Sequence, residues 1–352
     1  MSISEVLVAG HVCVDLSPTF SGAARIEPGA LFSVGALGMR VGGSIANTGE
    51  MLSKLGVSVR AHGLVGDDDL GRIARRGLDE VGGIDVDLVI AEDYATSYSI
   101  VIQPPGQDRT FWHHTGANDA FDGTTVDARD SRLVHLGYPP LLPGTVVDEG
   151  APLVTMLERV RAEGATTSLD LAVVDPASDA GRVDWDRFFD AVMPHVDILT
   201  PSIDDLSSAL RVGARDGLAA ELADRMIERG AGIVAISEGE RGLLVRSGSA
   251  ERLARGGPVL AALGEEWADV QIRAAPVPIR KMSTTNGAGD AATAGLLAAL
   301  LRGADPTSSA AAAVQAAANW IGSEHTGMSY PSSTTNDEAS RSFREAESPA
   351  DS

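Results

Sequence analysis

The chain has 352 residues, an ordinary apolar fraction of 44% and a formal net charge of -21 at pH 7. So negative a chain is a poor partner for nucleic acid or for an anionic membrane surface. Its single cysteine, Cys13, excludes an intramolecular disulfide. Neither a signal-like N-terminus nor an uncharged apolar run of about 18 residues is found. These features together predict a cytoplasmic protein that binds neither nucleic acid nor membrane.

The first predicted element is a buried parallel strand over residues 6–10, a short apolar run that ends in glycine. Asp15 follows it closely. Because the carboxyl ends of such strands usually meet ligands, Asp15 is a candidate binding residue, although a surface-loop aspartate is equally compatible with the pattern. Residues 18–41 are rich in Pro and Gly and favour turns and short strands over helix.

A second candidate site begins at Gly42-Gly43, which opens an amphipathic helix with Asn47 one turn in. The double glycine permits close approach of the backbone to a ligand, which alone is weak evidence. The pattern then predicts a strand, a helix and a strand, over residues 57–65, 67–81 and 86–90.

Residues 98–102 and 109–112 flank a Pro-Pro-Gly turn, which predicts a β-hairpin. His113 and His114 follow it, but adjacent residues of a strand point to opposite faces, and no acidic or cysteine partner has ligand spacing. The sequence therefore argues against a metal site at the histidine pair.

From residue 133 onward, apolar strands alternate with helical stretches as far as residue 236, which predicts a parallel sheet covered by helices. Asp204 and Asp205 fall in the first turn of a predicted helix, where complementing the helix dipole explains them well. Ser237 follows a predicted strand, and Gly239 and Gly242 in the turn after it are able to face a nucleotide.

The most informative stretch is residues 284–290, a Gly-rich turn that runs into a helix of small residues over about 287–301. Unpaired N–H groups and the dipole at a helix start attract an anion, and Asp290 on the same turn is placed to accept a proton. The match of residues 287–292 to a dinucleotide-binding pattern fails, because no clear strand precedes it and no acidic residue follows at the required spacing. Phosphoryl transfer to a hydroxyl fits better.

Several motifs in this order resemble those of the ribokinase-type, or PfkB, carbohydrate kinases: Gly42-Gly43 with Asn47, Leu64–Asp67 with Gly71, Asp197–Pro201, Gly239 with Gly242, and Thr285–Asp290. The resemblance spans residues 5–328. It implies an α/β three-layer sandwich with a mostly parallel central sheet, and a small β-sheet lid from about residues 11–41 and 95–115. The kinase domain would occupy residues 1–329, and the polar residues 330–352 predict a disordered tail.

The resemblance also implies roles for individual residues. Asp290 would be the catalytic base, and the anion hole would comprise Gly287, Ala288 and Gly289. Contacts to the sugar hydroxyls would come from Asp15, Gly42, Gly43 and Asn47. The ATP side would comprise Ser237, Gly239, Gly242 and Asn286. The implied cofactors are ATP and Mg²⁺.

Three positions depart from the family pattern. Thr284 stands where relatives have an aspartate that helps to hold a monovalent cation, which argues against potassium activation. Ser202 and Asp205 replace an Asn-x-x-Glu motif, so Asp205 would reach Mg²⁺ only through water. Glu238 stands where an uncharged or basic residue is usual near the nucleotide phosphates.

Two alternatives to a sugar kinase remain: a nucleoside kinase of the same fold, and a catalytically weak sugar-binding or regulatory homologue. The identity of the sugar is not predicted. Candidates on the lid are Trp112, His113, His114 and Asn118, for which ordinary packing is an equally good explanation. An apolar face of the lid is compatible with a homodimer.

Overall fold

In the computed structural model, which describes residues 4–22, 27–106, 109–280 and 284–323, the chain forms two β-sheets of very different size. The larger has nine strands in the order β13-β12-β11-β10-β9-β8-β1-β4-β5. From β11 to β5 all neighbours are parallel, whereas β12 and β13 add to the edge antiparallel. The strands are β1 (Ser4–Gly10), β4 (Val59–Val65), β5 (Ile84–Ile90), β8 (Ser131–Gly137), β9 (Thr166–Asp170), β10 (Ile198–Leu199), β11 (Ile233–Ser237), β12 (Leu243–Ser247) and β13 (Gln271–Ala274).

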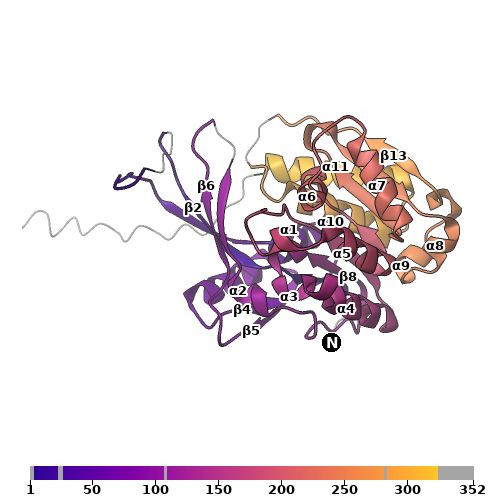
Figure 1. Ribbon diagram of the computed structural model, residues 1–352, viewed down its shortest axis with the longest axis horizontal. Helices are drawn as coiled ribbons and strands as arrows, with labels where there is room; N and C mark the ends of the chain where they lie inside the picture. Colours follow the sequence, from indigo (N-terminus) through magenta and orange to yellow (C-terminus); the bar gives the residue numbers. More distant parts are fainter. Residues whose placement is uncertain (1–3, 23–26, 107–108, 281–283, 324–352) are drawn as a thin grey trace, which may run out of the picture.

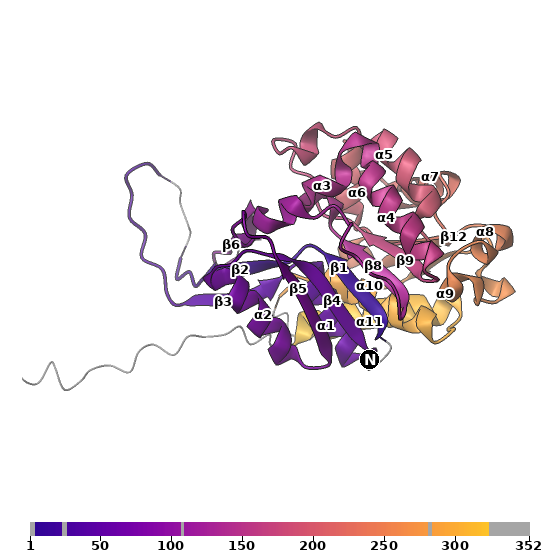
Figure 2. The ribbon, with the colours of Figure 1, turned by 90° about the horizontal axis from the view of Figure 1, so that it is seen from below.

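Helices cover both faces of this sheet, so that the fold has three layers (Figure 2). One face carries α1 (Ser44–Lys54), α2 (Asp69–Val81), α8 (Ala250–Ala254), α9 (Pro258–Ala261), α10 (Ala288–Leu301) and α11 (Pro306–Gly322). The other carries α3 (Pro143–Val146), α4 (Ala151–Ala162), α5 (Trp185–Val192), α6 (Ile203–Leu210) and α7 (Leu218–Glu228).

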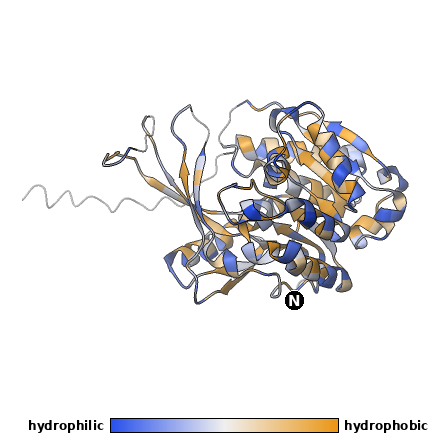
Figure 3. Cartoon of the chain, in the orientation of Figure 1, coloured by the Kyte–Doolittle hydropathy of each residue, from blue (hydrophilic) through white to orange (hydrophobic). Residues whose placement is uncertain are grey.

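The alternation of side chains along the strands divides the apolar core between these two layers. In β1, Val6 and Val8 pack into the first core, and Leu7 and Ala9 into the second. Both faces of the strand are therefore buried, which is why its sequence is continuously apolar. Figure 3 shows the same division, with hydrophobic strands inside and hydrophilic residues on the outward helix surfaces.

The smaller sheet projects from the body as a lid, in the order β3-β2-β6-β7 (Figure 1). Its strands are β2 (Cys13–Pro18), β3 (Leu37–Gly42), β6 (Tyr98–Ile102) and β7 (Thr110–His114). They come from the two stretches that the sequence assigned to a lid, and the predicted hairpin is β6–β7. The predicted three-layer α/β fold with a small second sheet is confirmed.

Helix α10 differs from the other helices because it is buried on all sides from Asp290 to Leu301. It packs against α11 and α1. A Cβ on Gly295 would lie 2.6 Å from the carbonyl oxygen of Ala312, so α11 approaches the α10 backbone closely at this point. The small residues of α10 therefore allow this close approach.

Three further points concern the ends and the exterior of the chain. The predicted tail, residues 330–352, lies outside the described residues. Within the described part, no helix is both long enough and apolar enough to span a membrane. Helices α5, α8 and α9 and the edge strand β13 lie in stretches for which the sequence pattern predicted no element.

Candidate active site

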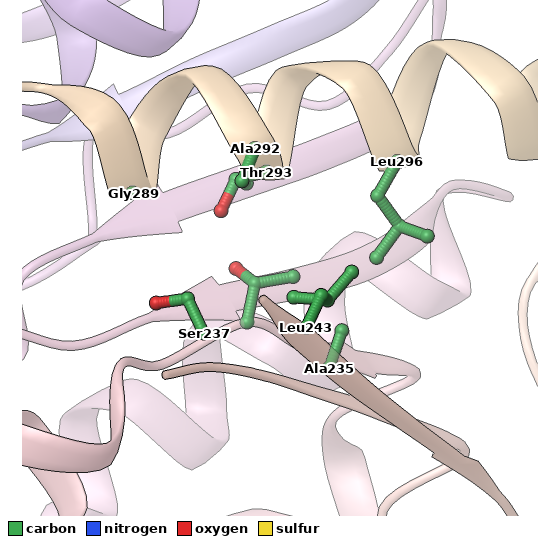
Figure 4. Close-up of a pocket in the computed structure, with 8 residues that line it drawn as sticks. Ala235, Ser237, Leu243, Gly289, Ala292, Thr293 and Leu296 are labelled. Atoms are coloured by element: carbon green, nitrogen blue, oxygen red, sulfur yellow. The ribbon is translucent and has the colours of Figure 1, made fainter. Parts of the chain in front are cut away.

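The start of α10 lies at the carboxyl edge of the central sheet, beside β11 and β12 (Figure 4). Gly287 is the N-cap residue and has φ 81°, a left-handed conformation suited to glycine. A Cβ at Gly287 would also lie 2.9 Å from the indole of Trp320. Ala288 N–H bonds the Thr285 carbonyl at 3.3 Å, and the next two amides, of Gly289 and Asp290, have no carbonyl of the helix to bond. The predicted anion hole therefore has the geometry of a helix N-terminus.

The Asp290 carboxylate is buried and receives three hydrogen bonds from neutral side chains. Asn47 Nδ2 donates to Oδ2 at 3.0 Å, and Thr48 Oγ1 donates to Oδ1 at 3.0 Å. The Tyr138 hydroxyl donates to Oδ2 at 2.6 Å. Burial nevertheless raises the pKa of Asp290 above its ordinary value, against these bonds and the more distant charge of Arg40. A carboxylate with these properties is suited to accept a proton.

The charge of Asp290 also acts on two further buried carboxylates, Asp170 and Asp205. Burial, followed by the charges of Asp290 and Asp205, raises the pKa of Asp170 well above its usual range. Burial raises the pKa of Asp205 to about 6, although Ser202 hydrogen-bonds to it. The carboxyl edge of the sheet thus holds three acidic groups that resist ionising together.

Asp15 and the double glycine form the side of the site beneath the lid. Asp15 is buried on β2, and a Cβ on Gly42 would lie 2.6 Å from its Oδ2. Gly43 has φ 87°, and a Cβ there would lie 2.5 Å from the His11 carbonyl oxygen. Both glycines are therefore required by close approach, and Gly42 leaves room for the Asp15 carboxylate.

The side-chain amides of Asn47 and Asn286 donate to carboxylates that their predicted roles did not include. Asn47, predicted to contact the sugar, donates to Asp290. Asn286, predicted on the ATP side, directs its Nδ2 toward Asp15 Oδ2 at 3.4 Å. The Asn47 amide therefore belongs to the surroundings of Asp290, and the Asn286 amide to those of Asp15.

Two arginines connect the lid to residues 284–290, the turn that contains the predicted anion hole (the anion-hole turn). Arg109, which precedes β7, donates from Nη1 to Thr285 Oγ1. Arg40 on β3 lies 4.8 Å above the ring centre of Trp320, whose Nε1 donates to the Asn286 carbonyl at 2.6 Å. The lid and the turn are thus in contact through side chains from both lid hairpins.

The two histidines of β7 lie in different surroundings. His113 Nε2 lies 3.3 Å from His11 Nε2, and its Nδ1 lies 3.0 Å from Ser99 Oγ. Burial lowers the pKa of His113 to about 4, with a smaller contribution from His114. His114 is exposed, and its ring lies 5.4 Å from that of Tyr98.

Of the other lid candidates, Asn118 is fully buried, with Nδ2 bonding the Val12 carbonyl at 3.0 Å, and Trp112 is 46% exposed. Asn118 therefore supports the backbone beside the lid, with one N–H of its side-chain amide bonded to the Val12 carbonyl.

The residues of the predicted nucleotide side lie at the end of β11 and in the turn that follows it. Ser237 and Gly289 line one narrow cavity of about 10 Å³, too small for a nucleotide base, between α10 and the strands β11 and β12 (Figure 4). Gly239 and Gly242, in the turn after Ser237, have φ 58° and 87°. Glu238 is paired with Arg273, and with Arg241 at 3.5 Å. Its charge is therefore balanced.

The donors near Asp205 bear on the expected Mg²⁺. Asp205 Oδ2 accepts the Ser202 N–H at 2.7 Å, and Ser202 Oγ accepts the Asp205 N–H at 3.1 Å, which makes a capping box at the start of α6. Among the described residues, no three His, Cys, Asp or Glu side chains form a group able to hold a metal ion. One carboxylate, water and phosphate oxygens are a usual donor set for Mg²⁺, so the residues fit an indirectly held ion.

Three polar side chains of this site were missed by the sequence analysis: Thr48, Tyr138 and Asp170. Thr48 follows Asn47 directly and shares its helical turn, which was a usable signal. Tyr138 and Asp170 end or follow strands of the parallel sheet, where ligand-facing residues are expected. Neither belongs to a recognisable motif, and their proximity to Asp290 depends on the order of the strands.

Comparisons with known proteins give the same assignment over most of the chain. Residues 4–333 match the pfkB family of carbohydrate kinases. A sugar kinase of Archaeoglobus fulgidus, itself uncharacterised, is 26% identical over 257 residues, which are 72% of this chain and 87% of the relative.

Solved structures show the same fold. Ribokinase of Arabidopsis thaliana, in complex with ribose and ATP, has a TM-score of 0.68 at 18% identity and covers 93% of this chain and 95% of its own. Thermotoga maritima ribokinase has a TM-score of 0.67 at 17% identity, over 97% and 99%. A microbiome-derived acarbose kinase has a TM-score of 0.66 at 20% identity, over 93% and 96%. The chain belongs to the pfkB family of carbohydrate kinases.

Proposed function

We propose that this sugar kinase transfers the γ-phosphoryl group of ATP to a hydroxyl of a sugar or sugar-like substrate, with Asp290 as the general base. The observation that carries the proposal is the buried Asp290 carboxylate on the first turn of α10, beside the free amides of the anion-hole turn. An acid next to an anion site is unfavourable at rest and useful when a substrate proton lies between the two.

In the proposed reaction, Asp290 accepts the hydroxyl proton while the hydroxyl oxygen bonds to the γ-phosphorus and the bond to ADP breaks. The free amides of Gly289 and Asp290 would stabilise charge that develops on the transferred group, and Ala288, whose N–H bonds the Thr285 carbonyl, completes the predicted anion hole. Mg²⁺ would neutralise charge on the phosphates, and Asp205 is the residue that would hold it through water.

The sugar is proposed to lie between Asp15 and Asp290, against the backbone of Gly42 and Gly43. Asp15 and Asn286 would then bond its other hydroxyls. Arg109 and Arg40 already connect the lid to the anion-hole turn, which supports closure of the lid over the substrate. Closure would exclude water, the competing phosphoryl acceptor.

The ATP is proposed to approach from the side of Ser237, Gly239 and Gly242. Gly239 in that turn is exposed and has a positive φ, and Glu238 is paired with Arg273 and Arg241. The three departures from the family pattern therefore reduce to two, at Thr284 and at the Ser202–Asp205 pair.

The proposal is tested by ADP release with Mg-ATP across hexoses, pentoses, sugar acids and nucleosides. Asp290→Asn should lower kcat by at least about 100-fold with little change in KM, because the base acts in the transition state. The control Asp79→Asn removes an exposed carboxylate of α2 and should leave kcat unchanged.

Each contrary outcome identifies an alternative. Turnover with nucleosides alone would indicate the nucleoside kinase. Clear sugar binding in calorimetry without turnover of any acceptor would indicate a binding or regulatory protein. A near-normal kcat for the Asp290 variant would mean that the base is misassigned.

A homodimer formed through the lid also remains a proposal. The lid and its connections expose large apolar side chains, at Leu31, Phe32, Val34, Leu37, Phe111 and Trp112. A surface of this kind commonly marks an interaction site. Sedimentation equilibrium of the wild type and of Trp112→Glu would test it, and identical monomeric masses would exclude pairing.

A further inference from the structure

Tyr138 enters the site by an unusual backbone conformation. It directly follows β8 and has φ 72° and ψ 53°, in the left-handed region that large side chains rarely adopt. Its N–H donates to the Asp170 carbonyl at 3.2 Å, and its ring lies 5.6 Å from that of His11. Such conformations persist where the surroundings enforce them, and they cluster at functional sites. Here the conformation brings the phenol to Asp290.

The three donors to Asp290 are divided unequally between its two oxygens. Oδ2 receives Tyr138 at 2.6 Å and Asn47 at 3.0 Å, whereas Oδ1 receives, from the residues that the structure describes, Thr48 alone at 3.0 Å. Each carboxylate oxygen has two lone pairs in the plane of the group. Oδ2 is therefore saturated, and Oδ1 retains one lone pair.

We infer that Tyr138 is a positioning residue that saturates Oδ2 together with Asn47, so that Oδ1 receives the proton of the attacking hydroxyl. The inference rests on the proposed function, because it specifies which oxygen of the base acts. The proton moves from the substrate oxygen to Oδ1, the oxygen–phosphorus bond forms, and ADP leaves with the electron pair of the broken bond. Tyr138 keeps its own proton throughout.

The charged and polar groups around Asp290 favour the neutral, proton-donating form of the Tyr138 phenol. Asp170 on β9 and Asp205 on α6 face it as acids, Arg40 on β3 contributes a positive charge, and Cys13 on β2 is a thiol. Burial and then the Asp290 charge raise the pKa of the Tyr138 phenol well above its usual range. Tyr138 therefore remains protonated and donates at every pH at which the enzyme would work.

The kinetic test is Tyr138→Phe, with Tyr94→Phe as the matched control on a tyrosine that is 41% exposed. A hydrogen bond to a charged group is strong, so its loss should lower kcat by about 10-fold or more, with KM for the sugar unchanged within about twofold. Loss of a donor to the carboxylate raises the pKa of Asp290. The acid limb of the kcat profile should then move to higher pH by about one unit.

Two kinetic results would overturn the inference. A raised KM with normal kcat would make Tyr138 a substrate contact. A reduced kcat with an unmoved acid limb would make its role structural.

A second measurement does not need activity. The chain has four tyrosines, so ¹³Cζ-tyrosine labelling gives a simple spectrum in which Tyr138→Phe assigns the Tyr138 signal. Asp290→Asn should shift that signal and lower the pKa of the phenol, since the neighbouring negative charge is gone. An unshifted signal would refute the contact even in an active kinase. A shifted signal in a protein that phosphorylates nothing would refute the proposed function and the positioning role of Tyr138 with it.

Discussion

A buried aspartate lies at each edge of the central sheet, and the two differ in the kind of group that binds the carboxylate. At the amino edge, Asp197 precedes β10 and is fully buried. Its Oδ1 pairs with Arg161. It also accepts from Nη1 and Nη2 of Arg252, both at 3.2 Å. Its Oδ2 accepts the N–H groups of Thr167 and Gly257, at 3.2 and 2.8 Å. At the carboxyl edge, the hydrogen bonds to Asp290 come from neutral side chains.

This difference separates a structural acid from one that is suited to accept a proton. Two guanidinium groups pair with the Asp197 carboxylate, and its removal would leave both of them without a counterion. Neutral donors hold the Asp290 carboxylate in place without matching its charge, so that its affinity for a proton stays high. Asp197 belongs to a motif shared with the family, and the structure gives that position a role in the fold.

The largest expected effect on stability comes from breaking the amino-edge cluster. Asp197→Ala leaves Arg161 and Arg252 without a buried counterion and should lower the free energy of unfolding by about 3–5 kcal/mol. Asp186→Ala is the matched control, since Asp186 also pairs with two arginines, Arg225 and Arg229, but is 50% exposed. It should cost only about 0–1 kcal/mol. Urea denaturation measures both, and equal losses would remove the distinction between the two kinds of cluster.

A substitution at the carboxyl edge should increase the free energy of unfolding, by less than Asp197→Ala lowers it. Asp205→Asn keeps an acceptor for the Ser202 N–H and removes a buried charge whose pKa is raised from 3.8 to about 6. Above pH 6 the folded wild type carries that charge at a cost. The variant should therefore be more stable by about 1–3 kcal/mol at pH 8.

The pH dependence follows from the same values. As pH falls below 6, the folded wild type takes up the proton and the difference between the two proteins should shrink, vanishing only below the unfolded pKa of 3.8. Thermal unfolding at pH 8 and pH 4.5 measures this. An equal or lower stability of the variant at pH 8 would show that the charge is compensated. Kinase activity should fall if Asp205 holds Mg²⁺ through water.

The smallest expected effect is that of the monovalent cation. Thr284 offers a hydroxyl where relatives have a carboxylate, and its Oγ1 already accepts the Asn286 N–H at 3.1 Å. Replacing potassium by sodium or choline should therefore leave kcat unchanged within about twofold. Strong activation by potassium would show that other groups supply the missing carboxylate. Thr284→Asp offers the converse comparison, with potassium activation as the expected gain.

The sequence predicted most of the fold because the alternation of buried strands and helices is a local pattern. It predicted no edge strand β13 and no helices α8 and α9, whose short segments lack a clear period. Asp290 was found because its glycines and its helix are contiguous with it. Tyr138 lies 152 residues away, and its contact with Asp290 depends on strand order and on one left-handed residue. Such long-range contacts have no local signature.

Trp320 gives the molecule an intrinsic optical probe. Its indole contacts Gly287 on one side, bonds the carbonyl of Asn286, and lies beneath the guanidinium of Arg40 from the lid. Indole emission responds to nearby charge and to hydrogen bonding, so movement of either the lid or the turn alters its fluorescence. Because this tryptophan is fully buried at the junction of the two, ligand titrations need no attached label.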